Sequence, residues 1–410
     1  MRKLIRLILL STAVFSCQKT FFDLPPRSHS GYPMPGRTGE AEELPTGPSV
    51  PDLYASAICL PADSTGGYDV LLFKNGTPVQ RVHMDGEPDP ERHRIWGGRL
   101  WTDECDGATM RICCDGQERF RYEGDERLRG FLETPEGNVY TLGQRQGREG
   151  LSLRLNGKEL FRAPTGTILG SPYECEWEGG ALAMDASGVF FAYGIPIGVE
   201  GKTLWEYHVM REGQLVQNIP AGSVQALYDI RVMDGVVYRC EQRGAALCLV
   251  EADTYRSLGL DEKEPHHLCK LFPLEGHMAV KGYSQVMPGL PTYRNWIRVG
   301  GEDLFVGYSA ERPLHLRCDG VHTAFLEEGP GRSVERMVLD GEKLSLGAEK
   351  RPPGTREPPY TLSSARCFQL QKGMLGVALD RDSTARHLLL RGRDTLGVSF
   401  DGYFTSVQID

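Results

Sequence analysis

Residues Pro135–Ala163, PEGNVYTLGQRQGREGLSLRLNGKELFRA, contain two tight-turn signals that each join two short segments. Glu136-Gly137 is the first signal and Asn156-Gly157 is the second. Asn-Gly accepts the positive φ values that a two-residue hairpin turn requires. Leucine at every second position from 151 to 155 alternates with polar residues, which is the pattern of a half-buried strand. With the preceding segment Leu128–Glu133, this stretch predicts four antiparallel strands, here called A, B, C and D in chain order.

The unit recurs in degenerate form from about Asp52 to the last residue, with a period of roughly 40–50 residues. The expected B strands are Leu53–Cys59, Arg99–Cys105, Asn138–Gly143, Val189–Gly194, Val236–Cys240, Met278–Ser284, 321–326 and Met374–Leu379. The expected A–B turns include Asp106-Gly107, Ser187-Gly188, Asp234-Gly235 and Asp319-Gly320. A period of this length predicts an all-β fold, a β-propeller of about eight four-stranded blades, with seven blades as the alternative.

The two ends of the repeat region complement each other. The first unit lacks an A strand, and the last unit is followed by a spare strand, Gly402–Ile409. Pairing of this strand with Leu53–Cys59 would close a ring and protect the sheet edges. A β-solenoid or two β-sandwiches are the alternatives, but a solenoid needs shorter repeats and no complementary ends.

The cadence Gly-x-Val-Tyr-x-x-Gly followed by Leu-x-Leu-x-Asn-Gly resembles the NHL, YWTD and related bacterial propeller repeats. The resemblance covers about Asp52 to Asp410 and lies in the pattern and the turn residues. It implies that the A strands are innermost. No catalytic residues are implied, because those families share none.

The N-terminus predicts export and lipid attachment. Residues 1–16 begin with positive charge and continue into a short apolar run, as in a secretory signal peptide. The sequence before Cys17 resembles the lipobox of bacterial lipoproteins, which implies lipidation of that thiol and anchoring at the cell envelope, with the outer membrane expected. Residues 17–51 are rich in Pro and Gly and predict a tether, and residues 52–410 form the predicted propeller domain.

The charge and composition of the sequence restrict the classes of partner that we expect. The net charge of −9 argues against a nucleic-acid binder, which needs basic patches. No motif in the sequence implies a cofactor. We expect the repeat region to be a monomeric domain. The expected partners are the membrane, through Cys17, and a glycan or an envelope protein.

Loop lengths indicate where a ligand would bind. Alternating strands place all B–C and D–A connections on one face of the ring, and binding residues usually lie on such loops. The longer loops expected on this face are Asp85–His93, Ser171–Gly180, Ile195–Lys202, Asp261–His267, Ser284–Asn295 and Glu349–Tyr360. The candidate ligand-binding residues are Tyr173, Trp177, Tyr293, Arg294, Trp296, Arg356 and Tyr360. Aromatic side chains can stack on a sugar or a peptide, and arginine can orient it. The tryptophans could equally fill gaps between blades.

Three functions remain open. The leading hypothesis is a non-catalytic binding or scaffold module at the envelope. The alternative is a carbohydrate-active hydrolase or lyase, in which Glu174 and Glu176 are weak candidates for acid and base. The third is a sensor-like partner in an envelope complex. Fold alone does not separate them.

Histidines and cysteines complete the candidate sites. His266 and His267 could bind a metal with His83 or His93, but adjacent strand residues point to opposite faces and no ligand spacing supports a site, so no metal is expected. Cys240 and Cys248 flank a short connection and could form a disulfide across a hairpin.

Overall fold

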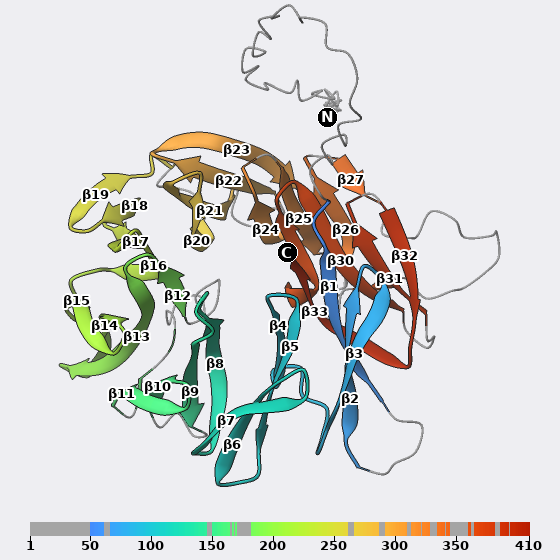
Figure 1. The fold of residues 1–410 in the computed structure, drawn as a ribbon. Coiled ribbons are helices and arrows are strands. Elements are labelled where there is room, and N and C mark those ends of the chain that lie inside the picture. Colours follow the sequence, from blue (N-terminus) through green and yellow to red (C-terminus); the bar gives the residue numbers. More distant parts are fainter. Residues whose placement is uncertain are drawn as a thin grey trace, which may run out of the picture. The chain divides into compact units, whose positions relative to one another are not determined.

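The computed structural model describes residues 50–60, 66–145, 150–164, 166–167, 169, 182–260, 266–286, 292–309, 313–320, 322–328, 334–340, 342–344, 360–361, 365–381, 386–392 and 394–410. Val50–Asp410 forms one compact unit, to which the following description applies. Its strands form eight antiparallel sheets that follow one another round a ring, as Figure 1 shows. The chain is therefore a β-propeller, and the eight-bladed prediction is confirmed.

The blades have the following strands. Blade 1 contains β33 (Gly402–Ile409), β1 (Leu53–Cys59), β2 (Tyr68–Lys74) and β3 (Thr77–Met84). Blade 2 contains β4 (His93–Trp96), β5 (Arg99–Cys105), β6 (Thr109–Cys114) and β7 (Gln117–Glu123); blade 3 contains β8 (Glu126–Glu133), β9 (Val139–Arg145), β10 (Leu151–Leu155) and β11 (Lys158–Arg162). Blade 4 contains β12 (Ala183–Asp185), β13 (Gly188–Val199), β14 (Lys202–Arg211) and β15 (Gln214–Ile219); blade 5 contains β16 (Ala226–Met233), β17 (Val236–Arg243), β18 (Ala246–Glu251) and β19 (Thr254–Ser257). Blade 6 contains β20 (His266–Leu274), β21 (His277–Gln285), β22 (Tyr293–Val299) and β23 (Glu302–Ser309); blade 7 contains β24 (Pro313–Cys318), β25 (Thr323–Glu328), β26 (Val334–Leu339) and β27 (Glu342–Leu344). Blade 8 contains β28 (Tyr360–Thr361), β29 (Phe368–Gln371), β30 (Met374–Arg381), β31 (Arg386–Arg391) and β32 (Asp394–Ser399), with the short 3₁₀ helix η1 (Ala365–Cys367) before β29.

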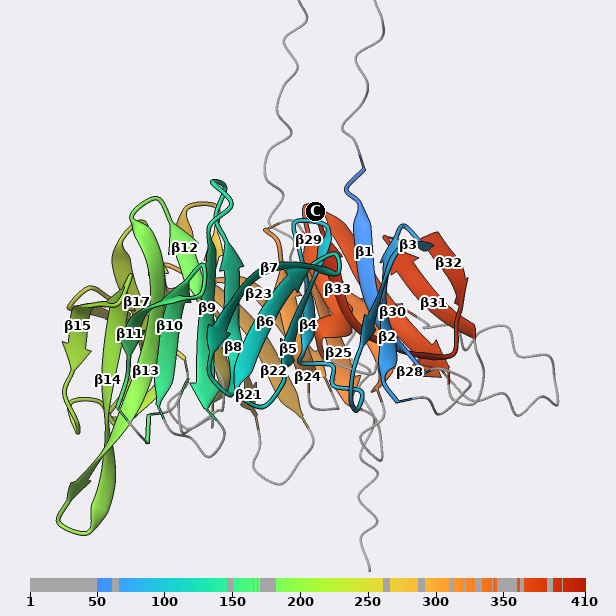
Figure 2. The same ribbon diagram turned by 60° about the horizontal axis from the view of Figure 1, so that its bottom comes forward.

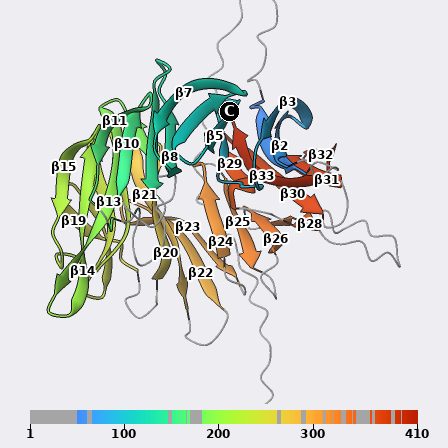
Figure 3. The ribbon, with the colours of Figure 1, turned by 90° about the horizontal axis from the view of Figure 1, so that it is seen from below.

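The A strands lie nearest the ring axis, as the resemblance implies, and the D strands lie on the outside (Figures 1 and 3). The central residues of the B strands are buried, because both faces of each sheet contact a neighbouring blade. In β1, for example, six of seven residues are buried. The outer strands are mostly exposed, as in β7. Burial thus falls from the B strands to the outermost strands, whereas the innermost strand β8 alternates between buried and less buried positions.

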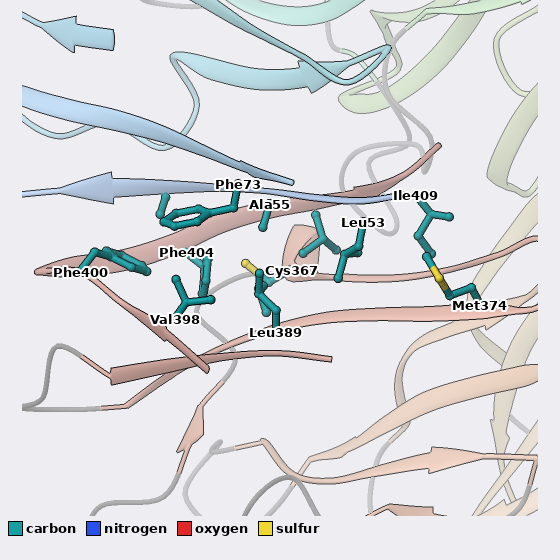
Figure 4. Packing of buried hydrophobic residues seen from close by; sticks show 13 residues of the cluster. Leu53, Ala55, Phe73, Cys367, Met374, Leu389, Val398, Phe400, Phe404 and Ile409 are labelled. Atoms are coloured by element: carbon teal, nitrogen blue, oxygen red, sulfur yellow. The ribbon is translucent and has the colours of Figure 1, made fainter. Parts of the chain in front are cut away.

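The first and last strands close the ring as predicted. β33 pairs antiparallel with β1, with Leu53 opposite Ile409 and Cys59 opposite Gly402. A continuous apolar cluster covers the junction, and Figure 4 shows the rings of Phe73, Phe400 and Phe404 meeting there. Closure therefore uses both backbone hydrogen bonds and apolar contacts between blades 8 and 1.

The C–D turns repeat one hydrogen-bonding device. The first turn residue has positive φ, as in Asn75 (50°), Asp115 (51°), Asn156 (49°) and Asp340 (49°). Its side-chain oxygen accepts a hydrogen bond from the backbone N–H of a residue at the start of the B strand; Val139 N donates to Asn156 Oδ1 over 2.9 Å, for example. The side chain thus fixes the turn against the neighbouring strand, which explains the Asx-Gly pattern in the sequence.

Three expectations need correction. Asp106-Gly107 lies between β5 and β6, a B–C connection, and the A–B turn of blade 2 is instead Gly97-Gly98, after a strand of only four residues. The expected loop at 195–202 belongs to the long hairpin of β13 and β14. The Cys240–Cys248 disulfide is wrong: both cysteines are free.

The strand register explains the free thiols. Cys240 lies opposite Leu249, and Cys248 lies opposite Glu241, so the two side chains point to opposite faces of blade 5. The described part of the chain contains no helix that is long and apolar enough to cross a membrane.

Candidate binding face

Strand order assigns the connections to two ends of the ring. All A–B and C–D connections, two to five residues each, lie at one end, here called the turn face. The B–C and D–A connections lie at the other end, here called the loop face. In the sequence, the longest intervals between successive strands whose ends meet this face are 163–182 and 345–359, followed by 60–67, 85–92 and 258–265 with eight residues each. Figure 2 shows the hairpin of β13 and β14 projecting from this end, at the lower left.

Both ends of the propeller unit lie on the turn face. The N–H of Asp410 donates to the carbonyl of Asp52 over 3.1 Å, and Asp52 lies beside Lys74 of the first C–D hairpin, with a carboxylate–ammonium distance of 2.7 Å. Arg391 donates to the carbonyl of Pro51 over 3.0 Å. The chain therefore enters the ring at the end opposite the loop face.

A network of charged side chains, here called the rim network, lies where the loop face meets the innermost strands of blades 2 and 3. Arg127, on β8, approaches Glu91 through Nε at 2.7 Å and Asp89 through Nη2 at 3.2 Å. Arg129, two residues further along, lies 3.7 Å from Glu91. Asp89 and Glu91 belong to segment 85–92, which connects blade 1 to blade 2. These ion pairs therefore hold the segment against β8, the inner strand of blade 3.

The rim network continues below the surface to Asp103 on β5. Arg94 donates to this carboxylate, and Arg92 Nη1 lies 3.6 Å from it. Burial raises the pKa of Asp103, while the two guanidinium groups oppose the shift. The arrangement presents partly exposed arginine and carboxylate groups whose positions are fixed by buried partners, as oriented recognition of a polar ligand requires.

Sequence reasoning identified the segment Asp85–His93 but not this network. The local signal was the alternation of acidic and basic residues in DGEPDPERHR, residues 85–94. The partners Arg127 and Arg129 are more than 30 residues away, on a strand of another blade. Only the three-dimensional arrangement of the blades brings these groups together.

Trp296 does not reach the loop-face surface. It is 0% exposed, and its indole N–H donates to Ser284 Oγ over 3.0 Å. Its ring belongs to the apolar cluster between blades 5 and 6. The structure therefore gives Trp296 the gap-filling role, and not a direct part in ligand binding.

The other candidates are only partly within the described residues. Tyr293 and Arg294 begin β22 at its loop-face end, are half-buried, and lie opposite Ser309 and Tyr308 of β23. Tyr360 lies at the loop-face end of β28, opposite Arg381. The remaining candidates, Tyr173, Trp177, Arg356, Glu174 and Glu176, and the lipidation residue Cys17 lie outside the described residues.

The candidate metal ligands have other neighbours. His266 Nδ1 lies 2.8 Å from Ser284 Oγ, and His93 Nε2 lies 2.7 Å from Thr405 Oγ1. His83 lies beside Asp69 in blade 1. Among the residues that the structure describes, no group of three or more His, Cys, Asp or Glu side chains is arranged to hold a metal ion.

Comparison with known proteins identifies a fold rather than a family. No protein-family model and no curated protein sequence matches the chain. Among solved structures, apo AztD from Citrobacter koseri is similar with a TM-score of 0.50 and 10% identity, over 87% of this chain and 97% of that chain. The β-propeller domain of the Trilobed protease from Pyrococcus furiosus has a TM-score of 0.43 and 11% identity, over 73% and 96%. At 10% identity, the likeness to AztD supports the propeller fold and nothing more about this chain.

Proposed function

We propose that this protein is a non-catalytic binding or scaffold module at the bacterial cell envelope, held there by lipid on Cys17 and binding its ligand through the loop face. One observation carries the proposal: the chain enters the propeller on the turn face, beside Asp410, while the long connections lie on the opposite face. Because the chain joins the propeller at the turn face, the point of attachment does not occupy the loop face.

The rim network supports a binding role for this face. Asp89, Glu91, Arg127 and Arg129 are each between 28% and 44% exposed, so they can contact a ligand while remaining ion-paired. Their mutual ion pairs already restrict the side-chain conformations in the unbound protein. Binding of a ligand therefore has a smaller entropic cost. A glycan or an envelope protein with polar groups could use these side chains for orientation.

A glycan array and a panel of polysaccharides, applied to the Val50–Asp410 unit, test the proposal when both binding and product release are followed. We expect binding without turnover, and at least a tenfold loss of affinity in Arg127→Gln, since a charge-assisted hydrogen bond contributes about 1.5–3 kcal/mol. The matched control is Arg121→Gln, because Arg121 also pairs with a carboxylate, that of Glu118, but lies on the outer strand β7.

The outcomes separate the three hypotheses. If the wild type shows turnover that is lost in Glu174→Gln or Glu176→Gln, the hydrolase hypothesis would be favoured over the binding-module hypothesis. Equal loss in Arg127→Gln and Arg121→Gln would show that the loop face is not the binding surface. No glycan binding would direct the search to an envelope protein, by crosslinking from a residue of the rim network. Membrane fractionation of Cys17→Ser tests the anchor, with release from the membrane as the expected result.

A further inference from the structure

A row of charged side chains on β17 leads from the interface between blades 4 and 5 to the surface. Arg239, Glu241 and Arg243 occupy alternate positions of this strand, so their side chains project from the same face of the sheet. Val237, two residues before the row, packs in the apolar cluster that blades 4 and 5 share, so this face is directed toward blade 4. Arg239 and Glu241 are buried, whereas the side chain of Arg243, the last residue of β17, is 39% exposed.

Glu241 fixes the orientation of the exposed guanidinium group. Its Oε2 accepts a hydrogen bond from Arg239 Nε over 3.2 Å, and its Oε1 accepts one from Arg243 Nε over 2.5 Å. A buried carboxylate is costly unless it is paired, which favours this contact in the folded protein. Because Nε is bound to Glu241, the two terminal nitrogens Nη1 and Nη2 remain as a pair of parallel N–H donors at the other end of the group.

Tyr255, on the outermost strand β19, supports the same guanidinium group. It lies opposite Val250, and Val250 lies opposite Arg239, so the tyrosine side chain shares the face of blade 5 that carries Arg243. The guanidinium carbon of Arg243 lies 4.9 Å from the centre of the Tyr255 ring. The tyrosine is itself 60% exposed. An aromatic surface and an oriented arginine are therefore presented side by side to the solvent.

This pair of groups matches a carboxylate that is attached to a rigid ring. The fork of an arginine binds a planar carboxylate through two parallel hydrogen bonds. The guanidinium group is already held by Glu241 and Tyr255, so binding would remove little of its conformational freedom. A ring next to the carboxylate could contact the exposed surface of Tyr255. A uronic acid, in which the carboxylate is attached directly to the sugar ring, has both groups.

We propose that Arg243 and Tyr255 bind the carboxylate and the ring of a uronic acid residue in an acidic glycan, with Glu241 as a positioning residue. The site lies in blade 5, between β17 and the outermost strand β19 (Figure 1). The rim network belongs to blades 2 and 3. The inference therefore goes beyond the proposed function and does not depend on ligand binding at the rim network.

Isothermal titration calorimetry of the full chain with a galacturonic acid trisaccharide tests the site. The fully methyl-esterified trisaccharide is the neutral ligand of similar shape. We expect the acid to bind at least about tenfold more tightly than the ester, because the ester lacks the charge-assisted hydrogen bonds. Arg243→Gln should lose at least about tenfold in affinity for the acid. Arg243→Lys should lose affinity as well, because lysine keeps the charge but not the fork. Tyr255→Ala should weaken binding by about two- to tenfold.

Arg162→Gln is the matched control, because Arg162 also pairs with a glutamate, Glu159, on the outer strand β11. It should retain the wild-type affinity. Arg243→Lys and Tyr255→Ala keep the test decisive in the event that Arg243→Gln does not fold. No binding of the acid by the wild type, equal binding of acid and ester, or wild-type affinity in Arg243→Lys would refute the site. A glutamate-containing tetrapeptide that binds as tightly as the trisaccharide and is lost in the same variants would overturn the glycan assignment in favour of an acidic protein partner.

Discussion

Lys281 lies buried between blades 6 and 7, although lysine is one of the residue types that are most often exposed. Its pKa of about 7 makes the stability of the protein depend on pH. Between pH 7 and 8.5 the folded amine loses its proton, while the unfolded amine, with an ordinary pKa, keeps it. The unfolded state then binds more protons, so stability rises with pH in this window.

We expect the free energy of unfolding to increase by roughly 1–2 kcal/mol from pH 7 to 8.5, from a limiting slope of about 1.4 kcal/mol per pH unit. Urea denaturation at a series of pH values measures this increase. Lys281→Met should flatten the dependence. Lys158→Met, which removes an exposed lysine from the outer strand β11, is the control and should leave the dependence unchanged. A wild-type slope that persists in Lys281→Met would assign the titration to another group.

Individual residues also show what the sequence could not predict. The alternation around Trp296 indicates a strand, but a propeller covers both faces of its inner strands, so periodicity does not show which side chains remain exposed. Likewise, the sequence placed Asp89 and Glu91 in a candidate segment without their partner Arg127. Residue environments in this fold depend on the neighbouring blade, which lies about 40 residues away in sequence.

The strands that the sequence predicted best are those next to Asx-Gly turns. All eight predicted B strands correspond to strands β1, β5, β9, β13, β17, β21, β25 and β30. The turns were predictable because positive φ and a side-chain acceptor restrict the residue type. The short strand β4 and the irregular pairing within β8, β16, β20 and β24 were not, since the local sequence carries no comparable restriction.

The C–D turns make a paired prediction about stability. Asn156→Ala should lower the free energy of unfolding by about 1–2 kcal/mol, because it removes the hydrogen bond to Val139 N and places alanine at positive φ. Ala252 occupies the equivalent position of blade 5 with φ of 51°, so Ala252→Asn should raise it by about 0.5–1 kcal/mol. Chemical denaturation measures both changes. Asn218→Ala, at an exposed strand position, is the neutral control. No loss of stability in Asn156→Ala, or a loss in Ala252→Asn, would refute the shared role of the turn side chain.

At the scale of the whole molecule, the sequence predicted the closure of the ring from its complementary ends. β33 supplies the A strand of blade 1, and its Thr405 hydroxyl lies 2.8 Å from Ser56 on β1 and 2.7 Å from His93 on β4. The last strand therefore connects blades 8, 1 and 2. The rim network was beyond prediction, because its residues come together only when separate blades are assembled in the ring.

Closure leads to a prediction about chain connectivity. Deletion of Gly402–Asp410 should abolish cooperative unfolding and produce aggregation, because it exposes the inner edge of β1 and opens the apolar cluster around Phe404. A circular permutant should keep the native circular dichroism spectrum and a cooperative transition if a short Gly/Ser linker joins Asp410 to Val50 and new ends are placed at Glu200-Gly201. A folded, cooperative truncation, or an unfolded permutant, would contradict the role of this strand.

The pairing of β33 with β1 also has a consequence for biosynthesis. Ser56 and its partner Thr405 are 349 residues apart in sequence. At a ribosomal rate of about 5–20 residues per second, β1 is synthesised roughly 20–70 s before its partner strand β33. Blade 1 can therefore be completed only after β33 has been synthesised, and until then the nascent chain carries an unpaired strand edge on β1. Binding by a chaperone, or passage through a secretion pore before folding, would be compatible with this order, because the propeller cannot close before β33 is made.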